Sequence, residues 1–317
     1  MRVNTVSFAA LGIFVAFIIT GCSTNTSNIA NMVQPDVIRP GSVKHAPQLP
    51  ETSSLLPPTL VPPMQAAAAG FQSLAFDDEF NSLSLAPSGG DSSTDNWYPG
   101  LWYEDSGPSS SQTQVNSGVL DLDWTRSGWS SSGLCDATVE GESNSALSGQ
   151  SFRYGYFEAR MKWDNVTGAW PAFWLLPVQA VEGQQNTGEL DIFEGQGLDP
   201  TYYGTLHTWD GSTPLWASSP NAFSTPAGTD FTQWHEYGLL WNAPENGQPG
   251  SVTWYFDNVS VGSASTTNLP NSVFDQQNYF LILSSQEGVN WNSCEPQSDG
   301  SAASINLYVD WVHVWEK

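Results

Sequence analysis

The chain contains few basic residues. Of its 317 residues, 8 are Lys or Arg and 32 are Asp or Glu, which gives a formal net charge of −24 at pH 7. Such an excess of negative charge disfavours tight binding to nucleic acid or to an anionic lipid surface, because the phosphate groups would be repelled. The same charge argues against sulfated polysaccharides as partners.

Cysteine is also scarce. The three cysteines are Cys22, Cys135 and Cys294, and no Cys-x-x-Cys pair or His-rich cluster accompanies them. Their spacing therefore gives no indication of a zinc or redox site. In an exported protein Cys135 and Cys294 could form a disulfide, and two unpaired thiols are the alternative.

Long apolar runs are absent except near the N-terminus. The run there, residues 7–21, is shorter than the roughly 20 residues that a helix needs to span a bilayer. The run follows Arg2 and ends in the letters ITGC, so residues 1–21 are expected to be an export signal peptide. The letters ITGC resemble the bacterial lipobox, in which the cysteine is acylated. This resemblance predicts a lipoprotein anchored through Cys22 to a bacterial membrane. Ser23, which follows the cysteine, is compatible with sorting to the outer membrane. An uncleaved membrane anchor is the alternative.

Residues 22–70 are rich in Pro, Ser, Thr and Asn and show no sustained periodicity. Proline keeps such a segment extended and prevents it from packing, so we expect a disordered tether. The folded part is then predicted to be one domain over residues 71–317, a length that all-β domains often reach as a single unit.

A helix of convincing length with an amphipathic stripe is also absent, whereas residues 154–163, 252–262 and 304–317 alternate polar and apolar side chains. In the last segment the alternation places Ile305, Leu307, Val309 and Trp311 on one face, and Asp257-Asn258 has the character of a hairpin turn. Many short alternating strands predict an all-β fold, an antiparallel two-sheet sandwich.

The sequence GELDIFEG at residues 188–195 places three carboxylates in a strand-like stretch. Side chains two residues apart share one face of a strand, so Glu189 and Asp191 point the same way. Glu194 lies at an odd interval from Glu189, and a regular strand would direct it to the other face. One extra residue, a β-bulge, would restore the phase and place all three acids on one surface.

Three carboxylates on one surface cannot all ionise easily, so their pKa values should separate into those of an ionised nucleophile and a protonated acid. A retaining glycosidase needs two such groups about 5 to 5.5 Å apart. The alternative is a solvated acidic face on a surface strand. The opposite face of this strand is apolar, and no Lys or Arg lies nearby in sequence, which favours catalysis.

The letters ELDIFE match the E-x-D-x-x-E signature of glycoside hydrolase family 16, in the bulged branch of laminarinase-like β-glucanases. The resemblance continues over roughly residues 74–317 in blocks that follow the family order: RYGYFEARMK, GAWPAFWLLP, GTLHTW, WHEYGLLW, VTWYFD and LYVDWVHVW. It implies a jelly-roll sandwich of the concanavalin A type, with sugar lying in a groove.

The resemblance also implies roles for the three acids. Glu189 would be the nucleophile, Asp191 its hydrogen-bonding helper, and Glu194 the general acid and base. Trp170 and Trp174 resemble aromatic residues that stack against sugar, although either could instead belong to the core. His207 matches a histidine that approaches the acids, and a purely structural role is its alternative.

Family members often carry a structural Ca²⁺, and Glu79, Gly118 and Asp310 fit the blocks that supply its ligands. Oxygen donors suit this hard cation, which would stabilise the fold and take no part in catalysis. No cofactor is expected for the reaction itself.

The resemblance therefore predicts a monomeric retaining endo-hydrolase of polysaccharide, most of all β-1,3-glucan or mixed-linkage β-1,3-1,4-glucan. Residues 95–114 and 284–296 depart from the common laminarinase versions and are expected to form loops that select the substrate. Agarose or bacterial exopolysaccharide as substrate, transglycosylation in place of hydrolysis, a non-catalytic carbohydrate-binding protein and a surface adhesin are the alternatives.

Overall fold

The computed structural model describes residues 60–85, 95–99, 112–125, 135–138, 150–178, 186–210, 213–217, 221–267, 269, 273–287, 289–290, 295–296 and 304–317. The predicted signal peptide, Cys22 and most of the predicted tether lie outside these ranges, as does Cys294. None of the described helices is long and apolar enough to cross a membrane.

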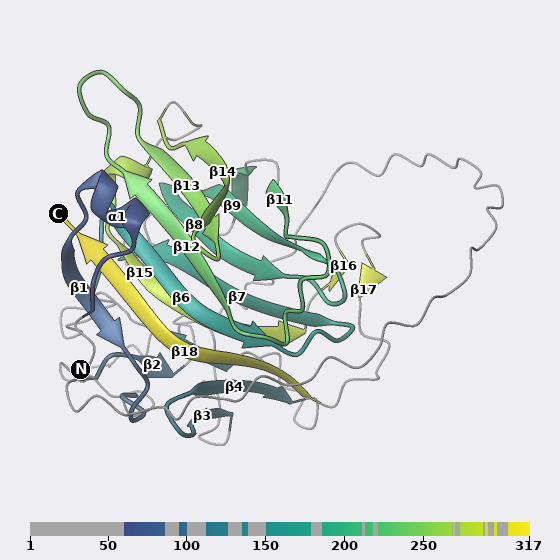
Figure 1. Ribbon diagram of the computed structural model, residues 1–317. Coiled ribbons are helices and arrows are strands. Elements are labelled where there is room, and N and C mark those ends of the chain that lie inside the picture. Colours follow the sequence, from purple (N-terminus) through teal and green to yellow (C-terminus); the bar gives the residue numbers. More distant parts are fainter. Residues whose placement is uncertain are drawn as a thin grey trace, which may run out of the picture. The chain divides into compact units, whose positions relative to one another are not determined.

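Two antiparallel sheets form the fold, and their strands can be followed in Figure 1. The first sheet has the order β14-β13-β12-β6-β18-β4-β3, with β1 paired to β18. Its strands are β1 (Ser73–Asp78), β3 (Thr113–Val115), β4 (Leu120–Thr125), β6 (Gly155–Trp163), β12 (His235–Asn242), β13 (Ser251–Phe256), β14 (Val259–Ser265) and β18 (Ser304–Glu316).

The second sheet has the order β10-β9-β8-β7-β15-β5-β2, with β11 paired to β9. Its strands are β2 (Tyr98–Pro99), β5 (Cys135–Thr138), β7 (Ala169–Pro177), β8 (Asn186–Gly195), β9 (Thr201–Asp210), β10 (Thr213–Ala217), β11 (Asn221–Ser224) and β15 (Tyr279–Glu287). A separate two-stranded ribbon pairs β16 (Val289–Asn290) with β17 (Glu295–Pro296), and a 3-10 turn, η1 (Phe274–Gln276), precedes β15.

The main core is built from apolar side chains of both sheets. Leu239 and Trp254 of the first sheet and Leu190 and Phe173 of the second are all completely buried in one cluster. Because alternate residues of each strand enter this cluster, the other residues of each strand face outward. The predicted all-β, two-sheet fold is confirmed.

A short helix, α1 (Met64–Ala69), lies inside the segment predicted to be a tether. Gly70 ends it in the left-handed conformation at φ 88°, and the Phe71 N–H donates to the Ala66 carbonyl at 2.9 Å. The Gln65 side chain donates to the hydroxyl of Tyr156 in β6. The folded part therefore begins before residue 71, because an alanine run followed by glycine favours a capped helical turn even next to prolines.

The predicted hairpin turn is present between β13 and β14. Phe256 pairs with Val259, and Asp257 and Asn258 both have positive φ, at 46° and 65°. Two consecutive left-handed residues are the geometry of a two-residue turn that suits the twist of an antiparallel pair.

The predicted face of β18 is wrong at one end. Ile305, Leu307 and Val309 enter the core, but the register shifts between Val309 and Trp311, and Val312 is the next core residue. Trp311 instead stacks on the ring of His313, with centroids 4.3 Å apart. A β-bulge at this point reverses the alternation that the sequence suggests.

Candidate functional site

The predicted bulge in β8 is present. Trp174 of β7 pairs with Asp191 and Phe173 pairs with Phe193, so Ile192 is the extra residue. The register with β9 shifts at the same point, between Asp191 and Glu194. Ile192 and Phe193 are consecutive and both enter the core, which returns Glu194 to the outward face that holds Glu189 and Asp191.

The bulge is tied to the first sheet through the core. The buried indole N–H of Trp254, in β13, donates to the backbone carbonyl of Asp191 at 2.8 Å. Gly204 of β9 makes room for this indole, since a Cβ at that position would lie 2.4 Å from Trp254 Nε1. The indole thereby supplies a donor to a backbone carbonyl at the bulge.

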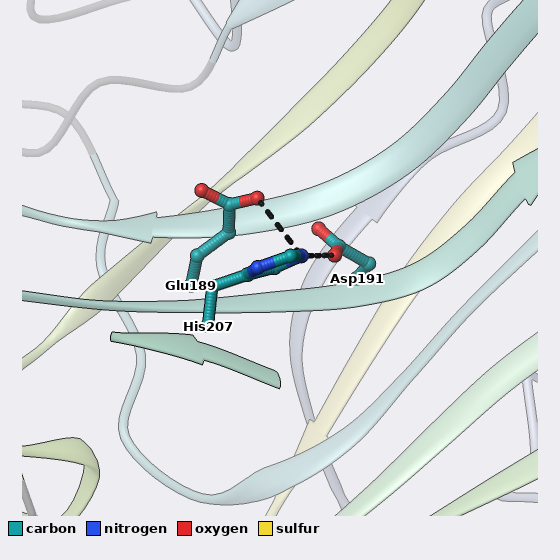
Figure 2. Close-up of side chains that lie close together, drawn as sticks. All are labelled: Glu189, Asp191 and His207. Carbon is teal, nitrogen blue, oxygen red and sulfur yellow. Dashed lines mark ion pairs between the residues drawn. The ribbon is translucent and has the colours of Figure 1, made fainter. Parts of the chain in front are cut away.

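Glu189, Asp191 and His207 form a compact cluster across β8 and β9, and Figure 2 shows the histidine ring edge directed at both carboxylates. His207 Nε2 lies 3.0 Å from Asp191 Oδ2 and 3.8 Å from Glu189 Oε1. His207 is paired directly with Glu189 across the two strands, so the predicted approach of this histidine to the acids is observed.

Two tryptophans hold the glutamates. The Trp209 indole donates to Glu189 Oε2 at 2.9 Å, and the Trp170 indole donates to Glu194 Oε1 at 3.0 Å. Trp170 was predicted to contact sugar, and the structure places it against an acid. Trp209 was not identified from the sequence, although its position two residues after His207 on the same strand puts it on the same face.

Trp174 lies on the same outward face of β7 but makes a different contact. Its indole donates to Ser284 Oγ at 3.1 Å, and its ring packs against a small apolar cluster that includes Leu176 and Ile282. Its ring is partly exposed, so it remains available for the predicted contact with sugar.

Burial controls the ionisation of the three acids. It raises the pKa of Asp191 to about 8, and burial followed by the charge of Asp191 raises that of Glu194 to about 8. The pKa of Glu189 is raised well above its usual value by burial and by Asp191, while His207 and the Trp209 hydrogen bond act to lower it. Burial removes water from these carboxyl groups and disfavours their charged forms, so the three acids do not all ionise at neutral pH.

Metal ions are commonly bound by His, Cys, Asp and Glu side chains. Among the described residues, one group of three such side chains has potential ligand atoms that all lie within 4.8 Å of one another, and it consists of Glu189, Asp191 and His207. Two carboxylates and an imidazole could ligate a cation. The same atoms together with Glu194 can also perform proton transfer and nucleophilic attack on one bound molecule.

The three positions predicted to bind Ca²⁺ lie near one stretch of β18. Val309 pairs with Leu120 of β4, just after Gly118, and Val312 pairs with Asp78 of β1, just before Glu79. Asp310 lies in the interval between these two pairings. The Glu79 carboxylate is 2.7 Å from His313 Nε2, and Asp310 pairs with Arg160.

Several predicted features lie outside the described residues. Cys22 and Cys294 are among them, and the side chain of Cys135 in β5 is not described, so the disulfide and the lipidation stay predictions. The predicted loops are only partly described. The expectation of a loop at residues 284–296 is wrong for its described part, because residues 284–287 end β15 and the described residues after them form β16 and β17. In the predicted loop at residues 95–114, the described residues include β2 and the start of β3, and residues 100–111 lie outside the described residues.

Comparisons with known proteins agree with this geometry. The model of "Glycosyl hydrolases family 16" matches residues 107–312. "Endo-1,3-1,4-beta-glycanase EglC" of Rhizobium meliloti is 31% identical over 269 residues, covering 76% of this chain and 51% of that protein. "Glucan endo-1,3-beta-glucosidase A1" of Niallia circulans is 29% identical over 178 residues, covering 53% of this chain and 25% of that protein.

Among solved structures, the catalytic domain of an endo-1,3-beta-glucanase (laminarinase) from Thermotoga petrophila superposes with a TM-score of 0.59 at 25% identity. The match covers 77% of this chain and 98% of that one. This chain spans about half the length of the first curated relative and a quarter of the second. A family match over more than half of the chain, on a two-sheet fold of the same kind, shows that the chain belongs to glycosyl hydrolase family 16.

Proposed function

We propose that the protein is a retaining, endo-acting β-glucanase. The observation that carries this proposal is the bulge in β8, which brings Glu189, Asp191 and Glu194 onto one outward face, each with a fixed polar neighbour. Two carboxyl groups on one surface, one to attack the sugar and one to protonate the leaving oxygen, are what cleavage of a glycosidic bond with retention requires.

In the first step Glu189 attacks the anomeric carbon of the bound sugar and forms a glycosyl ester, and the bond to the leaving oxygen breaks. Glu194 gives its proton to that oxygen, which leaves as a hydroxyl group. A pKa of about 8 keeps Glu194 protonated at neutral pH, as a general acid must be.

In the second step the ionised Glu194 takes a proton from water, the water oxygen bonds to the anomeric carbon, and Glu189 leaves as a carboxylate. The acid is thereby restored for the next cycle. A sugar hydroxyl can replace water at this point, and the outcome is then transglycosylation.

Asp191 and His207 prepare the nucleophile. With a pKa of about 8, Asp191 is protonated at neutral pH and can donate its hydrogen bond to Glu189, which favours the carboxylate form of Glu189. His207 faces both Glu189 and Asp191, and its imidazole gives these two buried carboxyl groups a further polar neighbour.

The proposed substrate is β-1,3-glucan or mixed-linkage β-1,3-1,4-glucan. The names of the relatives, an endo-1,3-1,4-beta-glycanase and a glucan endo-1,3-beta-glucosidase, support this class. Trp174 offers an apolar ring beside the acids, and sugar rings present apolar C–H faces to such platforms.

The test is the release of new reducing ends from laminarin, mixed-linkage glucan, agarose and a bacterial exopolysaccharide by the wild type and by Glu189→Gln. We expect cleavage of the first two, and a loss on the order of 10⁴-fold or more in the variant, because no nucleophile remains. Equal, negligible rates in both proteins on every glycan would overturn the proposal in favour of a carbohydrate-binding protein or an adhesin.

We also propose that the protein is exported and held at a bacterial membrane, as an outer-membrane lipoprotein, through Cys22. The support is the N-terminal sequence alone. Full-length protein should partition with membranes, and Cys22→Ser should release it. A Cys22→Ser protein that stays with the membrane would contradict lipid anchoring and favour an uncleaved anchor.

A structural Ca²⁺ held by Glu79, Gly118 and Asp310 is a further proposal. The pairing of β18 with β1 and β4 places these positions near one another, and their oxygen atoms suit the ion. Glu79 would have to leave His313, and Asp310 would have to leave Arg160. We expect Ca²⁺ to raise the melting temperature of chelator-treated protein, and Asp310→Asn to abolish that rise; an unchanged melting temperature would contradict the site.

A further inference from the structure

Trp209 makes a diagonal contact across two strands. It is paired with Thr187, and its indole reaches Glu189, two residues further along β8 and on the same face. Diagonal neighbours in an antiparallel pair are within reach of long and aromatic side chains. The contact is a hydrogen bond of 2.9 Å from Nε1 to Oε2, while Oε1 of the same carboxylate faces His207.

The indole differs from the other neighbours of Glu189. A carboxyl group such as that of Asp191 and an imidazole such as that of His207 can both donate and accept hydrogen bonds, whereas an indole N–H is a donor only. Its hydrogen bond therefore always favours the ionised carboxylate and never competes for the proton. It is also made by one atom of a rigid ring, so it fixes the direction in which the carboxylate lies.

On the basis of the proposed function, we propose that Trp209 is a positioning residue for the nucleophile, holding Glu189 oriented and ready for attack. Trp170 provides the same kind of bond to Glu194. The two indoles thus serve different acids, and the acids act in different ways in the first step. This difference allows the two roles to be separated by experiment.

The discriminating substrate is a laminari-oligosaccharide with a 2,4-dinitrophenyl group at its reducing end. This leaving group departs without protonation, so formation of the glycosyl ester from it needs the nucleophile and does not need the general acid. We expect Trp209→Phe to slow this step on the order of 10- to 100-fold, the effect of losing a hydrogen bond to a charged group. Trp170→Phe should slow polysaccharide cleavage more than cleavage of the aryl substrate.

A second readout is the pH profile of kcat/KM, whose acidic limb reports the ionisation of the nucleophile in the free enzyme. Removing a donor that favours the carboxylate raises the pKa of Glu189, so the acidic limb should move to higher pH in Trp209→Phe. An unmoved limb together with an undiminished rate on the aryl substrate would overturn the inference. A slower rate with an unmoved limb would also overturn it, because the tryptophan would then only shape the site.

Two further variants separate loss of the hydrogen bond from a change of shape or a general effect of removing a tryptophan. Replacing Trp209 by benzothienylalanine exchanges the N–H for sulfur with little change of shape, and it should reproduce the effects of Trp209→Phe even if the phenyl variant folds poorly. Trp234→Phe is the matched control: this ring lies under Arg160 and Lys162 of β6, in the other sheet, and its loss should leave the pH profile unchanged. A wild type without activity on any β-glucan would refute the proposed function, whereas an active wild type with unaffected Trp209 variants would refute this inference alone.

Discussion

The outward faces of the two sheets resemble each other in the indoles and histidines beside their buried acids, and they differ in that one acid of the first sheet, Asp310, also has an arginine partner. On the first sheet, the buried Glu158 accepts from the Trp315 indole at 2.8 Å and lies 3.7 Å from His313, and Asp310 pairs with Arg160. On the second sheet, no described Lys or Arg forms an ion pair with any of the three acids of β8. Their neighbours are a histidine and two indoles.

The difference separates stability from catalysis. A carboxylate paired with a cation is favoured in its ionised form, and the pair contributes little net free energy to folding. A buried carboxylate without a cation has a raised pKa, and it is then able to carry a proton at neutral pH. Asp310 thus has a cationic partner, whereas none of the described Lys or Arg side chains pairs with the three acids of β8, where chemistry is proposed. Asp121 of β4, whose pKa burial and the charge of Asp123 raise to about 6, shows that burial raises the pKa of an acid on the first sheet as well.

The largest effect on stability is expected from cutting the link between the sheets. Trp254→Phe removes a buried indole, leaves a cavity and deprives the Asp191 carbonyl of its donor. We expect a loss of about 3 to 5 kcal/mol in the free energy of unfolding, measured by urea denaturation. Activity at a temperature where the variant is still folded should also fall, because the bulge loses its anchor; unchanged kcat there would contradict a role of this link in the site.

Next in size is Glu158→Gln on the first sheet. The amide oxygen can still accept from Trp315, but His313 loses one of its two charged neighbours. Burial lowers the pKa of His313, and its interactions with Glu158 and Glu79 outweigh burial and raise it. We expect a loss of about 1 to 3 kcal/mol below pH 6.5, shrinking as the pH rises through the folded pKa of the histidine. A loss that grew with pH would contradict this assignment.

The matching change on the second sheet should have the opposite sign. Glu194 has its pKa raised from 4.5 to about 8 by burial and by Asp191, so the folded state holds a proton that the unfolded state has released. Stability from this group therefore falls as the pH rises from about 4.5 to about 8. We expect Glu194→Gln to raise the melting temperature at pH 8 by about 2 to 4 °C per kcal/mol recovered, and by less at pH 4. An equal change at both pH values would count against an ionisation effect.

The smallest effect is expected for Asp310→Asn in the absence of Ca²⁺. Both partners of the Arg160 pair are about one-third exposed, so water already screens their attraction. The free energy of unfolding should change by about 0 to 1 kcal/mol, and less at high salt. A loss of several kcal/mol would place this pair among the buried interactions and weaken the contrast between the sheets.

The two bulges explain what the sequence could and could not predict. In β8 the odd interval between Asp191 and Glu194 was recognisable because charged residues avoid the core, so the pattern required an extra residue. In β18 the same odd interval separates Val309 from Val312, but Trp311 is apolar enough to pass for a core residue. Alternation thus predicts strands well, and it locates a bulge where the neighbouring side chains differ clearly in polarity.

The hydrogen bonds of the site were harder to predict. The family block GTLHTW predicts a role for His207, whereas Trp209 in the same block carries no specific signal, because an aromatic residue on a strand can equally belong to the core or bind a ligand. The bond from Trp254 to Asp191 joins residues 63 positions apart in different sheets. Contacts of this kind depend on how two sheets pack, which local patterns do not encode.

The anchoring of the β8 bulge from across the core also bears on how the protein loses activity on heating. Loops that open independently can inactivate an enzyme well before it melts. Here the strand carrying the acids is bonded to the opposite sheet through Trp254, so we expect its backbone amides to be among the slowest to exchange with deuterium. Inactivation by heat and global melting should then follow the same curve.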